Sequence, residues 1–205
     1  MEAWQEMRRP DPRHSDDYRG TTLRQVDWSN ELETVRRLFK EYREWLAGHR
    51  DPSDAAQART MRGLAELDRQ IAELPGSYGP PDGEVILAFA SGAVVACGAL
   101  QRLEPGVGEI KRIYVREDHR GPGFGPILTQ ALLDRARALG YERVRVDTLP
   151  TMTAAIQFYQ EMGFVPIPSY WPHPVPGALF FEFTLHGAPG ARRPRGTATP
   201  GTQRS

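Results

Sequence analysis

The sequence lacks cysteine pairs and any long apolar run. Cys97 is the single cysteine among 205 residues, which excludes an internal disulfide and a multi-cysteine zinc site. The longest apolar stretch, residues 85–100, is interrupted by Ser91 and Gly92 and is too short to span a bilayer. Residues 1–20 are charged, without the apolar segment of a secretory signal. We therefore expect a cytoplasmic protein in which Cys97 is reduced.

An excess of charge of one sign is also missing. The chain has 26 Lys and Arg against 26 Asp and Glu, so its formal net charge is zero. This balance argues against a protein built to coat nucleic acid or an acidic membrane, and we expect neither as a partner. The histidines His49, His119 and His173 are scattered without metal-ligand spacing, so we expect no metal site.

The length favours one domain that can bury a substantial core. We assign this domain to residues 20–185. Residues 1–19 form an N-terminal extension that we expect to be partly disordered. Residues 186–205 contain four arginines, no acid and almost no large apolar side chain. Such a segment cannot offset the entropy of ordering, so we expect a disordered C-terminal tail.

Within the domain, apolar spacing and turn residues predict alternating helices and strands. The predicted strands are 22–26, 84–90, 93–103, 109–115, 143–148, 164–167 and 179–185. The predicted helices are 30–48, with Asn30 as N-cap, and 53–74, 124–139 and 152–162. The order begins with antiparallel strands and continues with a strand–helix–strand unit. We therefore expect an α/β protein with a mixed sheet flanked by helices.

The most informative segment is the turn Arg-Gly-Pro-Gly-Phe-Gly at residues 120–125, between a predicted strand and a predicted helix. Its glycines allow the backbone to approach a ligand closely. The first turn of a helix leaves N–H groups unpaired, and the helix dipole favours an anion there. The segment therefore fits a pyrophosphate site, although a glycine-rich turn without a ligand is an equally good interpretation of this motif alone.

Three segments in order resemble the GNAT superfamily of acetyl-CoA-dependent N-acetyltransferases: GEIKRIYV, then RGPGFG opening a helix, then AAIQFYQEMGF. The stretches DTLPTMTAAIQFY and PVPGALFFEF are similar to a bacterial subgroup of small-molecule acetyltransferases. The resemblance implies a central mixed sheet of six to seven strands with splayed middle strands, flanked by about four helices. It also implies acetyl transfer from acetyl-CoA to a primary amine of a small molecule by direct attack in a ternary complex. GNAT relatives are often dimers, so a homodimer is one expected assembly.

The resemblance also implies which residues hold acetyl-CoA. The backbone of the 109–115 strand would bind the pantetheine arm, and the turn would hold the pyrophosphate. The implied residues are Ile113, Tyr114, Val115, Arg120, Gly121, Gly123, Phe124, Gly125 and Pro126. The sequence departs from the family at Pro122, Pro126 and Met152. Each proline removes an amide donor, which makes Arg120 the main expected positive charge near the diphosphate.

Acetyl transfer needs a base for the amine, a donor for the developing oxyanion and an acid for the thiolate. Glu109 matches the position of the general base in some GNAT enzymes, and Asp147 is the rival base. The backbone N–H of Ile113 would polarise the carbonyl, which suits an interrupted strand ladder because a bulge frees an amide. Tyr159 matches the general acid. Two structural alternatives remain open. Glu109 could instead pair with a neighbouring cation, Lys111 or Arg112, and Tyr159 could be a core aromatic residue.

The identity of the acceptor does not follow from the sequence. The residues expected near it are Tyr42, Trp45, Asp147, Tyr170 and His173. Arg24, Arg43 and Arg50 are equally placed candidates for binding a substrate carboxylate. Two other functions remain open, namely acetylation of a protein N-terminus or lysine, and acyl-CoA sensing without catalysis. Cys97 lies in an apolar strand and is expected in the core rather than as a nucleophile.

Overall fold

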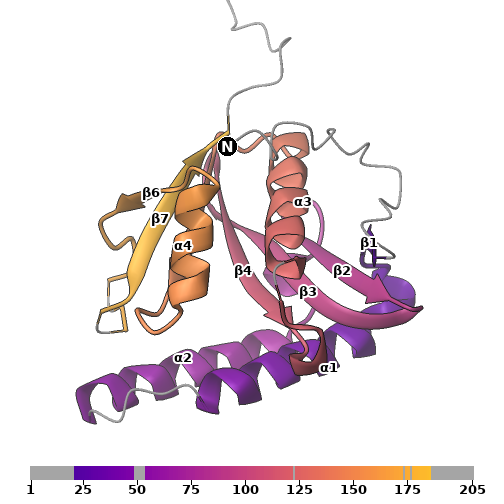
Figure 1. Cartoon of the computed structure of the whole chain (residues 1–205), viewed down its shortest axis with the longest axis horizontal. Coiled ribbons are helices and arrows are strands. Elements are labelled where there is room, and N and C mark those ends of the chain that lie inside the picture. Colours follow the sequence, from indigo (N-terminus) through magenta and orange to yellow (C-terminus); the bar gives the residue numbers. More distant parts are fainter. Residues whose placement is uncertain (1–20, 49–53, 122, 173, 176, 186–205) are drawn as a thin grey trace, which may run out of the picture.

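The computed structural model describes residues 21–48, 54–121, 123–172, 174–175 and 177–185. These residues form seven strands and four α-helices (Figure 1). The strands are β1 (Thr21–Gln25), β2 (Glu84–Ala90), β3 (Ala93–Glu104), β4 (Val107–Val115), β5 (Arg143–Thr148), β6 (Val165–Ile167) and β7 (Leu179–Thr184). The α-helices are α1 (Trp28–Gly48), α2 (Asp54–Ala72), α3 (Phe124–Ala138) and α4 (Thr153–Glu161), with short 3₁₀ turns η1 (Gly76–Tyr78) and η2 (Glu117–His119).

All strands belong to one sheet, in the order β1-β2-β3-β4-β5-β7-β6. β4 and β5 are parallel, whereas the other neighbouring strands are antiparallel. The parallel pairing covers only residues 107–109 of β4 against 143–145 of β5. Beyond Glu109 the two strands diverge. The expected mixed sheet with splayed middle strands is therefore confirmed.

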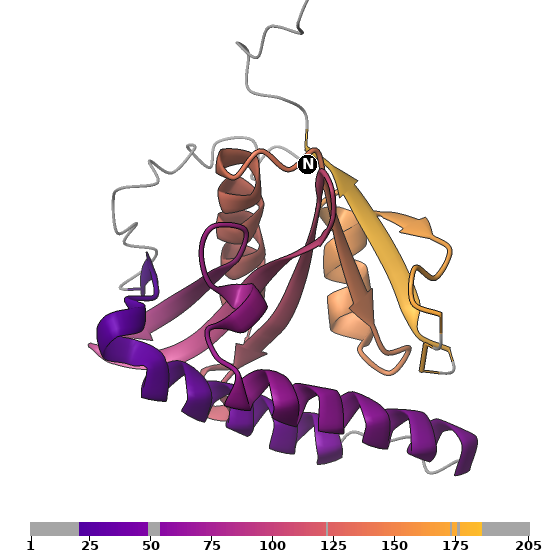
Figure 2. The ribbon, with the colours of Figure 1, turned by 180° about the vertical axis from the view of Figure 1, so that it is seen from behind.

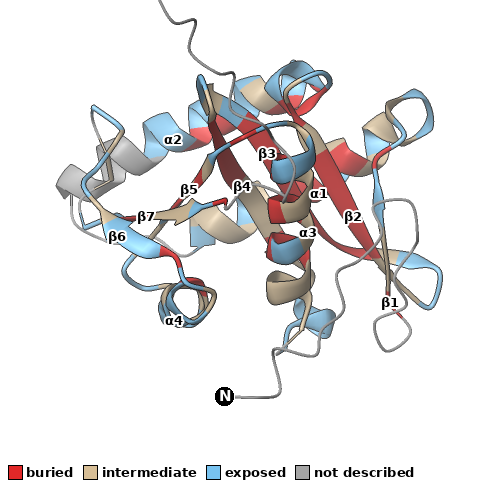
Figure 3. Cartoon of the chain, turned by 90° about the horizontal axis from the view of Figure 1, so that it is seen from above, coloured by how far each residue is buried: buried red, intermediate tan, exposed pale blue. Residues whose placement is uncertain are grey.

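The helices cover opposite faces of the sheet. α3 and α4 lie on the face toward the viewer in Figure 1, and α1 and α2 lie on the other side, as the reverse view in Figure 2 shows. Each face has its own apolar cluster. Leu128, Leu132 and Tyr159 belong to the cluster under α3 and α4, and Val35 and Leu38 belong to the one under α1 and α2. The central strands between them are mostly buried (Figure 3).

Cys97 lies in the second of these clusters and is 0% exposed. Burial raises the pKa of its thiol to about 12, so the thiol is protonated at neutral pH. The prediction of a core cysteine is confirmed.

The predicted element ends agree with the structure to within about two residues, but the predicted cap of the first helix was wrong. α1 begins at Trp28, before Asn30. The cap is formed by Asp27, whose carboxylate accepts hydrogen bonds from the backbone N–H of Ser29 at 3.0 Å and from the Asn30 side chain at 2.7 Å. Asp and Asn are both good caps, so residue type alone did not separate them.

Candidate active site

A bulge in β4 shapes the region where β4 and β5 diverge. Ala99 of β3 faces Lys111, and Cys97 faces Tyr114, so Gly98 alone faces two residues of β4. Arg112 is one of these two and has a positive φ of 59°. The other, Ile113, packs in the cluster under α3. The interrupted ladder expected at Ile113 is therefore present, and a bulge of this kind leaves backbone groups outside the ladder.

The carboxylate of Glu109, at the end of the β4–β5 ladder, is fully buried and faces three donors. Gln101 Nε2 donates to one oxygen at 2.8 Å. Lys111 Nζ and the Tyr170 hydroxyl each donate to the other oxygen at 3.0 Å. Of the two cations that the sequence offered as partners, Glu109 pairs with Lys111. Three donors hold Glu109 in place, and its side chain is 0% exposed.

Lys111 bridges the two strands where their ladder has ended. Its Nζ also lies 3.4 Å from a carboxylate oxygen of Asp147 on β5 and 5.1 Å from the ring centre of Trp171. Burial lowers the pKa of Lys111, but the nearby charges of Asp147 and Glu109 raise it by more. The pKa therefore lies above its ordinary value, and the amine is charged at neutral pH. Asp147, whose side chain is 38% exposed, is the more accessible of the two predicted bases.

The segment between β6 and β7 brings Tyr170 to this cluster. The Tyr170 ring packs on Phe180, with ring centres 5.1 Å apart, and the Arg145 guanidinium lies 5.4 Å from its centre. Burial, and then the Glu109 charge, raise the pKa of Tyr170, so its hydroxyl remains a donor. Glu109 and Tyr170, two predicted site residues that lie far apart in the sequence, are thus in contact. His173 lies outside the described residues.

Tyr159, the predicted acid, is buried on α4 among aromatic side chains. Its ring centre lies 5.2 Å from that of Phe158, 5.3 Å from Phe164 and 6.2 Å from Phe181. Burial raises its pKa, and the negative charge of Asp147 adds to the effect. The hydroxyl is therefore protonated at neutral pH, as an acid requires. The core position that the sequence left as an alternative is also present, so its catalytic role stays a prediction.

The predicted acceptor residues Tyr42 and Trp45 lie on α1 against β4. Their rings lie 6.2 Å and 6.4 Å from the ring of Tyr114. The Arg120 guanidinium lies 5.2 Å from the Trp45 ring centre, and its Nε donates to the Val115 carbonyl at 3.1 Å. Arg120 therefore joins the end of β4 to α1.

The glycine-rich turn leaves space at the start of α3. A Cβ built at Gly121, Gly123 or Gly125 would have no neighbour within 4 Å. Gly123 is the N-cap residue and brings no side-chain cap. Pro126 has no N–H, and the Ile127 N–H donates to the Gly123 carbonyl at 3.2 Å. The donors left in the first turn are the N–H groups of residues 124 and 125. Pro122 lies outside the described residues.

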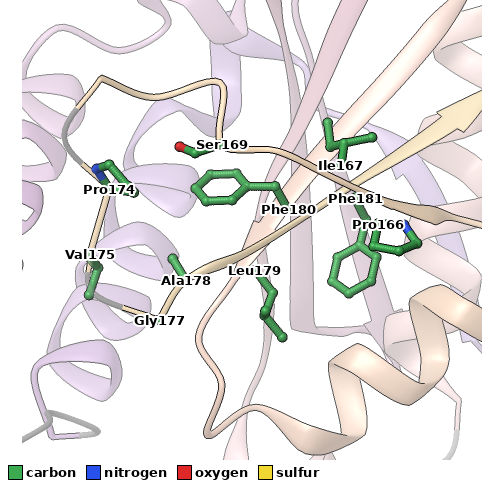
Figure 4. Close-up of a pocket in the computed structure, with 10 residues that line it drawn as sticks. All are labelled: Pro166, Ile167, Ser169, Pro174, Val175, Gly177, Ala178, Leu179, Phe180 and Phe181. Carbon is green, nitrogen blue, oxygen red and sulfur yellow. The ribbon is translucent and has the colours of Figure 1, made fainter.

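A separate pocket of about 280 Å³ lies beside β6 and β7 (Figure 4). Its lining residues are Pro166, Ile167, Ser169, Pro174, Val175, Gly177, Ala178, Leu179, Phe180 and Phe181. None of these residues was predicted to act in catalysis or binding. The pocket adjoins the cluster around Glu109 through Phe180, on which Tyr170 packs, but no residue of the carboxylate cluster lines it.

The described residues contain no group of three or more His, Cys, Asp or Glu side chains able to hold a metal ion. None of their helices is long and apolar enough to cross a membrane.

Sequence reasoning missed part of the cluster. Gln101 was not assigned to the site, and Lys111 was considered only as a partner for Glu109. Trp171, which the sequence placed beside Tyr170 in the proline-rich segment near the acceptor, lies over Lys111. Gln101 lies on β3 and reaches Glu109 across the ladder, which residue spacing in one strand does not reveal. A bulge that frees an amide was expected near Ile113, but the sequence did not indicate that Arg112 would lie in it.

A seven-stranded sheet whose parallel middle strands diverge, with a glycine-rich turn before α3, defines an acyltransferase fold. The comparisons agree with this class. The acetyltransferase (GNAT) family matches residues 32–164. The chain belongs to this family and is an N-acetyltransferase enzyme.

Individual relatives share about a third or less of their aligned residues with this chain. The chain is 31% identical over 121 residues to an uncharacterised N-acetyltransferase from Schizosaccharomyces pombe, covering 58% of this chain and 74% of the relative. It is 33% identical over 134 residues to an IAA acetyltransferase from Azospirillum brasilense, covering 60% and 88%. Its fold is similar to that of the PaiA N-acetyltransferase from Thermoplasma acidophilum in complex with coenzyme A, with a TM-score of 0.60, 16% identity and coverage of 80% and 99%.

Proposed function

We propose that this enzyme transfers the acetyl group of acetyl-CoA to a primary amine of a small molecule by direct attack in a ternary complex. The observation that carries the proposal is the divergence of β4 and β5 beyond Glu109. It frees backbone groups of β4 beside a cluster in which Lys111 contacts two carboxylates, Glu109 and Asp147, and the Tyr170 hydroxyl donates to Glu109. The Tyr159 hydroxyl, on α4, is near enough to Asp147 for that charge to raise its pKa.

The described residues fit acetyl-CoA. The open Cβ positions of Gly121, Gly123 and Gly125 leave room for a diphosphate against the backbone, and the two free amides at the start of α3 would donate to it. Arg120 would add the positive charge. The backbone of Ile113, Tyr114 and Val115 would bind the pantetheine arm as an added strand. The similar structure from T. acidophilum, which holds coenzyme A, supports this assignment.

Acetyl-CoA supplies an activated thioester, and the chain's own residues position it and move protons. The Ile113 N–H would donate to the carbonyl oxygen as negative charge develops there. A carboxylate, Asp147 or Glu109, would take the proton of the amine, and Tyr159 would give a proton to the leaving thiolate. The raised pKa of Tyr159 keeps this proton available at neutral pH.

Direct attack is favoured because the chain offers no cysteine nucleophile. Cys97 is the single cysteine, and burial keeps its thiol protonated, whereas the thiolate is the nucleophilic form. The acetyl group would then pass to the amine without an acyl-enzyme intermediate.

A small acceptor is favoured over a protein by the segment between β6 and β7. Tyr170 bonds Glu109, and the Trp171 ring lies over Lys111, so this segment lies over the carboxylate cluster. An acetyltransferase acting on a peptide needs an open groove at the same place.

The test is a steady-state measurement of thiol release from acetyl-CoA with three acceptor classes: small primary amines, a peptide with a free N-terminus and a peptide with an internal lysine. We expect turnover with small amines and double-reciprocal lines that intersect when both substrates are varied. Parallel lines would contradict direct attack, and turnover confined to the peptides would contradict a small acceptor.

A further inference from the structure

Arg112 is a half-buried cation that forms no ion pair with a carboxylate in the part of the chain that the structure describes, although its charge acts on Glu66 at longer range. Other cations around it are matched: Lys111 by Glu109 and Asp147, Arg116 by Glu41, and Arg145 by Glu182. Arg112 Nε donates to the Tyr78 hydroxyl at 3.2 Å, and its Nη2 donates to the Gln70 side-chain oxygen at 2.7 Å. Both partners are neutral.

The nearest connection to an anion is indirect. The Gln70 amide donates to Glu66 at 2.9 Å, and Glu66 is already held by two hydrogen bonds from Arg69, at 3.0 and 2.6 Å. The Tyr42 ring lies 5.7 Å from the guanidinium of Arg112, and the Tyr42 hydroxyl interacts with it as well. A guanidinium has five N–H donors, and a charge removed from water is costly when its partners are only neutral groups.

The position of Arg112 places this charge at the proposed reaction centre. It lies in the β4 bulge between Lys111, which contacts both candidate bases, and Ile113, whose N–H would polarise the thioester carbonyl. Its positive φ turns the side chain to the face of α1 and α2, where Tyr78 and Gln70 hold it. Arginine in a desolvated site beside an aromatic ring is well suited to binding a carboxylate in two-point contact.

We propose that Arg112 binds a carboxylate of the acceptor, so that the acceptor is an amino acid. Its amine would lie toward Asp147 and Glu109, and its carboxylate toward the guanidinium. The proposal rests on the proposed function, since it names the substrate class of that same site. The other predicted candidates are less suitable. Arg24 pairs with Glu31 and Arg43 with Asp68, and Arg50 lies outside the described residues.

The test compares each amino acid with the amine that lacks only its carboxylate: glycine with methylamine, and β-alanine with ethylamine. We expect the wild type to have the higher kcat/KM for the amino acid of each pair. In Arg112→Gln, the ratio of kcat/KM within a pair should fall about 10- to 100-fold, the effect of losing one charge-assisted contact. The loss should appear mainly in KM for the amino acid. Arg112→Lys should retain part of the ratio.

The matched control is Arg102→Gln, which removes one positive charge from β3, where Arg102 pairs with Asp82. Its ratio should equal that of the wild type. A second measurement uses the wild type alone and does not depend on the variant folding: propionate should compete with β-alanine and not with acetyl-CoA.

The results separate this proposal from the one on which it rests. A wild type that acetylates both members of each pair equally, or that propionate does not inhibit, would overturn the role of Arg112 and leave the proposed function standing. A fall in thermal stability of Arg112→Gln with an unchanged ratio would show that Arg112 only ties α2 to the sheet. A wild type that binds acetyl-CoA but acetylates no small amine would overturn both.

Discussion

Two carboxylates compete for the proton of the acceptor amine, and their surroundings differ. Glu109 is fully buried with three donors on its oxygens, so a substrate amine reaches it only through Lys111 or Tyr170. Asp147 forms an ion pair with Lys111 at 3.4 Å, and its side chain is 38% exposed. Direct proton removal by Asp147, with Glu109 positioning Lys111 and Tyr170, agrees best with this geometry.

Substitution of each carboxylate by its amide separates the two roles. We expect Asp147→Asn to lower kcat/KM about 100-fold, in the range for loss of a general base, with little change in thermal stability, because its side chain is partly exposed. Glu109→Gln should lower thermal stability, since Lys111 loses a buried partner, and should reduce kcat/KM less than Asp147→Asn does. A larger loss of kcat/KM in Glu109→Gln, in a variant that remains folded, would make Glu109 the base.

The turn η1 fixes the side of the site that faces α2. Tyr78 of η1 is 1% exposed and bonds both Gln70 and Arg112. Ser77 donates to Gln101 at 2.9 Å, and Gln101 donates to Glu109. The turn therefore contacts Arg112 of β4 directly, through Tyr78, and Glu109 of β4 indirectly, through Ser77 and Gln101.

Gly83 makes the position of η1 testable. A Cβ at Gly83 would lie 2.3 Å from the backbone oxygen of Ser77, a contact that only movement of the turn can relieve. We expect Gly83→Ala to lower the free energy of unfolding by about 1–3 kcal/mol and to reduce acetyl transfer, because Tyr78 moves.

The control for this substitution is Gly63→Ala in α2, where a Cβ would meet nothing within 4 Å. In an exposed helix interior, alanine should stabilise by up to about 1 kcal/mol, with no effect on transfer. Chemical denaturation of both variants measures the difference. Equal stability of the two variants would contradict the tight approach of Gly83 to η1.

The elements themselves were largely predictable because their signals are local. Apolar spacing set α1 and α3, and Gly92 marked the turn between β2 and β3. The prediction of Asn30 as the cap of α1 was wrong because Asp27 and Asn30 are equally good candidates by residue type. The contact of Tyr170 with Glu109 was not predictable from spacing, since it depends on how the segment between β6 and β7 returns to the sheet.

For the whole molecule, the motifs predicted the family and the splayed sheet, and the three-dimensional arrangement supplied the site. The sequence placed Glu109, Asp147 and Tyr159 as separate candidates. The structure joins the first two through Lys111, a contact that forms only because β4 and β5 diverge after residue 109. Among the described residues, the lack of an ion pair at Arg112 likewise becomes visible only in the structure, where Lys111, Arg116 and Arg145 each pair with an acid.

Every catalytic role proposed here depends on acetyl-CoA binding between β4, β5 and the start of α3, and calorimetric titration with acetyl-CoA tests that binding. We expect micromolar binding by the wild type and weaker binding by Arg120→Ala. Acetyl-CoA at 100 times its Kd should also stabilise the fold by about 2.7 kcal/mol. Absence of binding at millimolar acetyl-CoA, in a folded wild-type protein, would contradict this binding site and with it the roles assigned to Asp147, Glu109 and Tyr159.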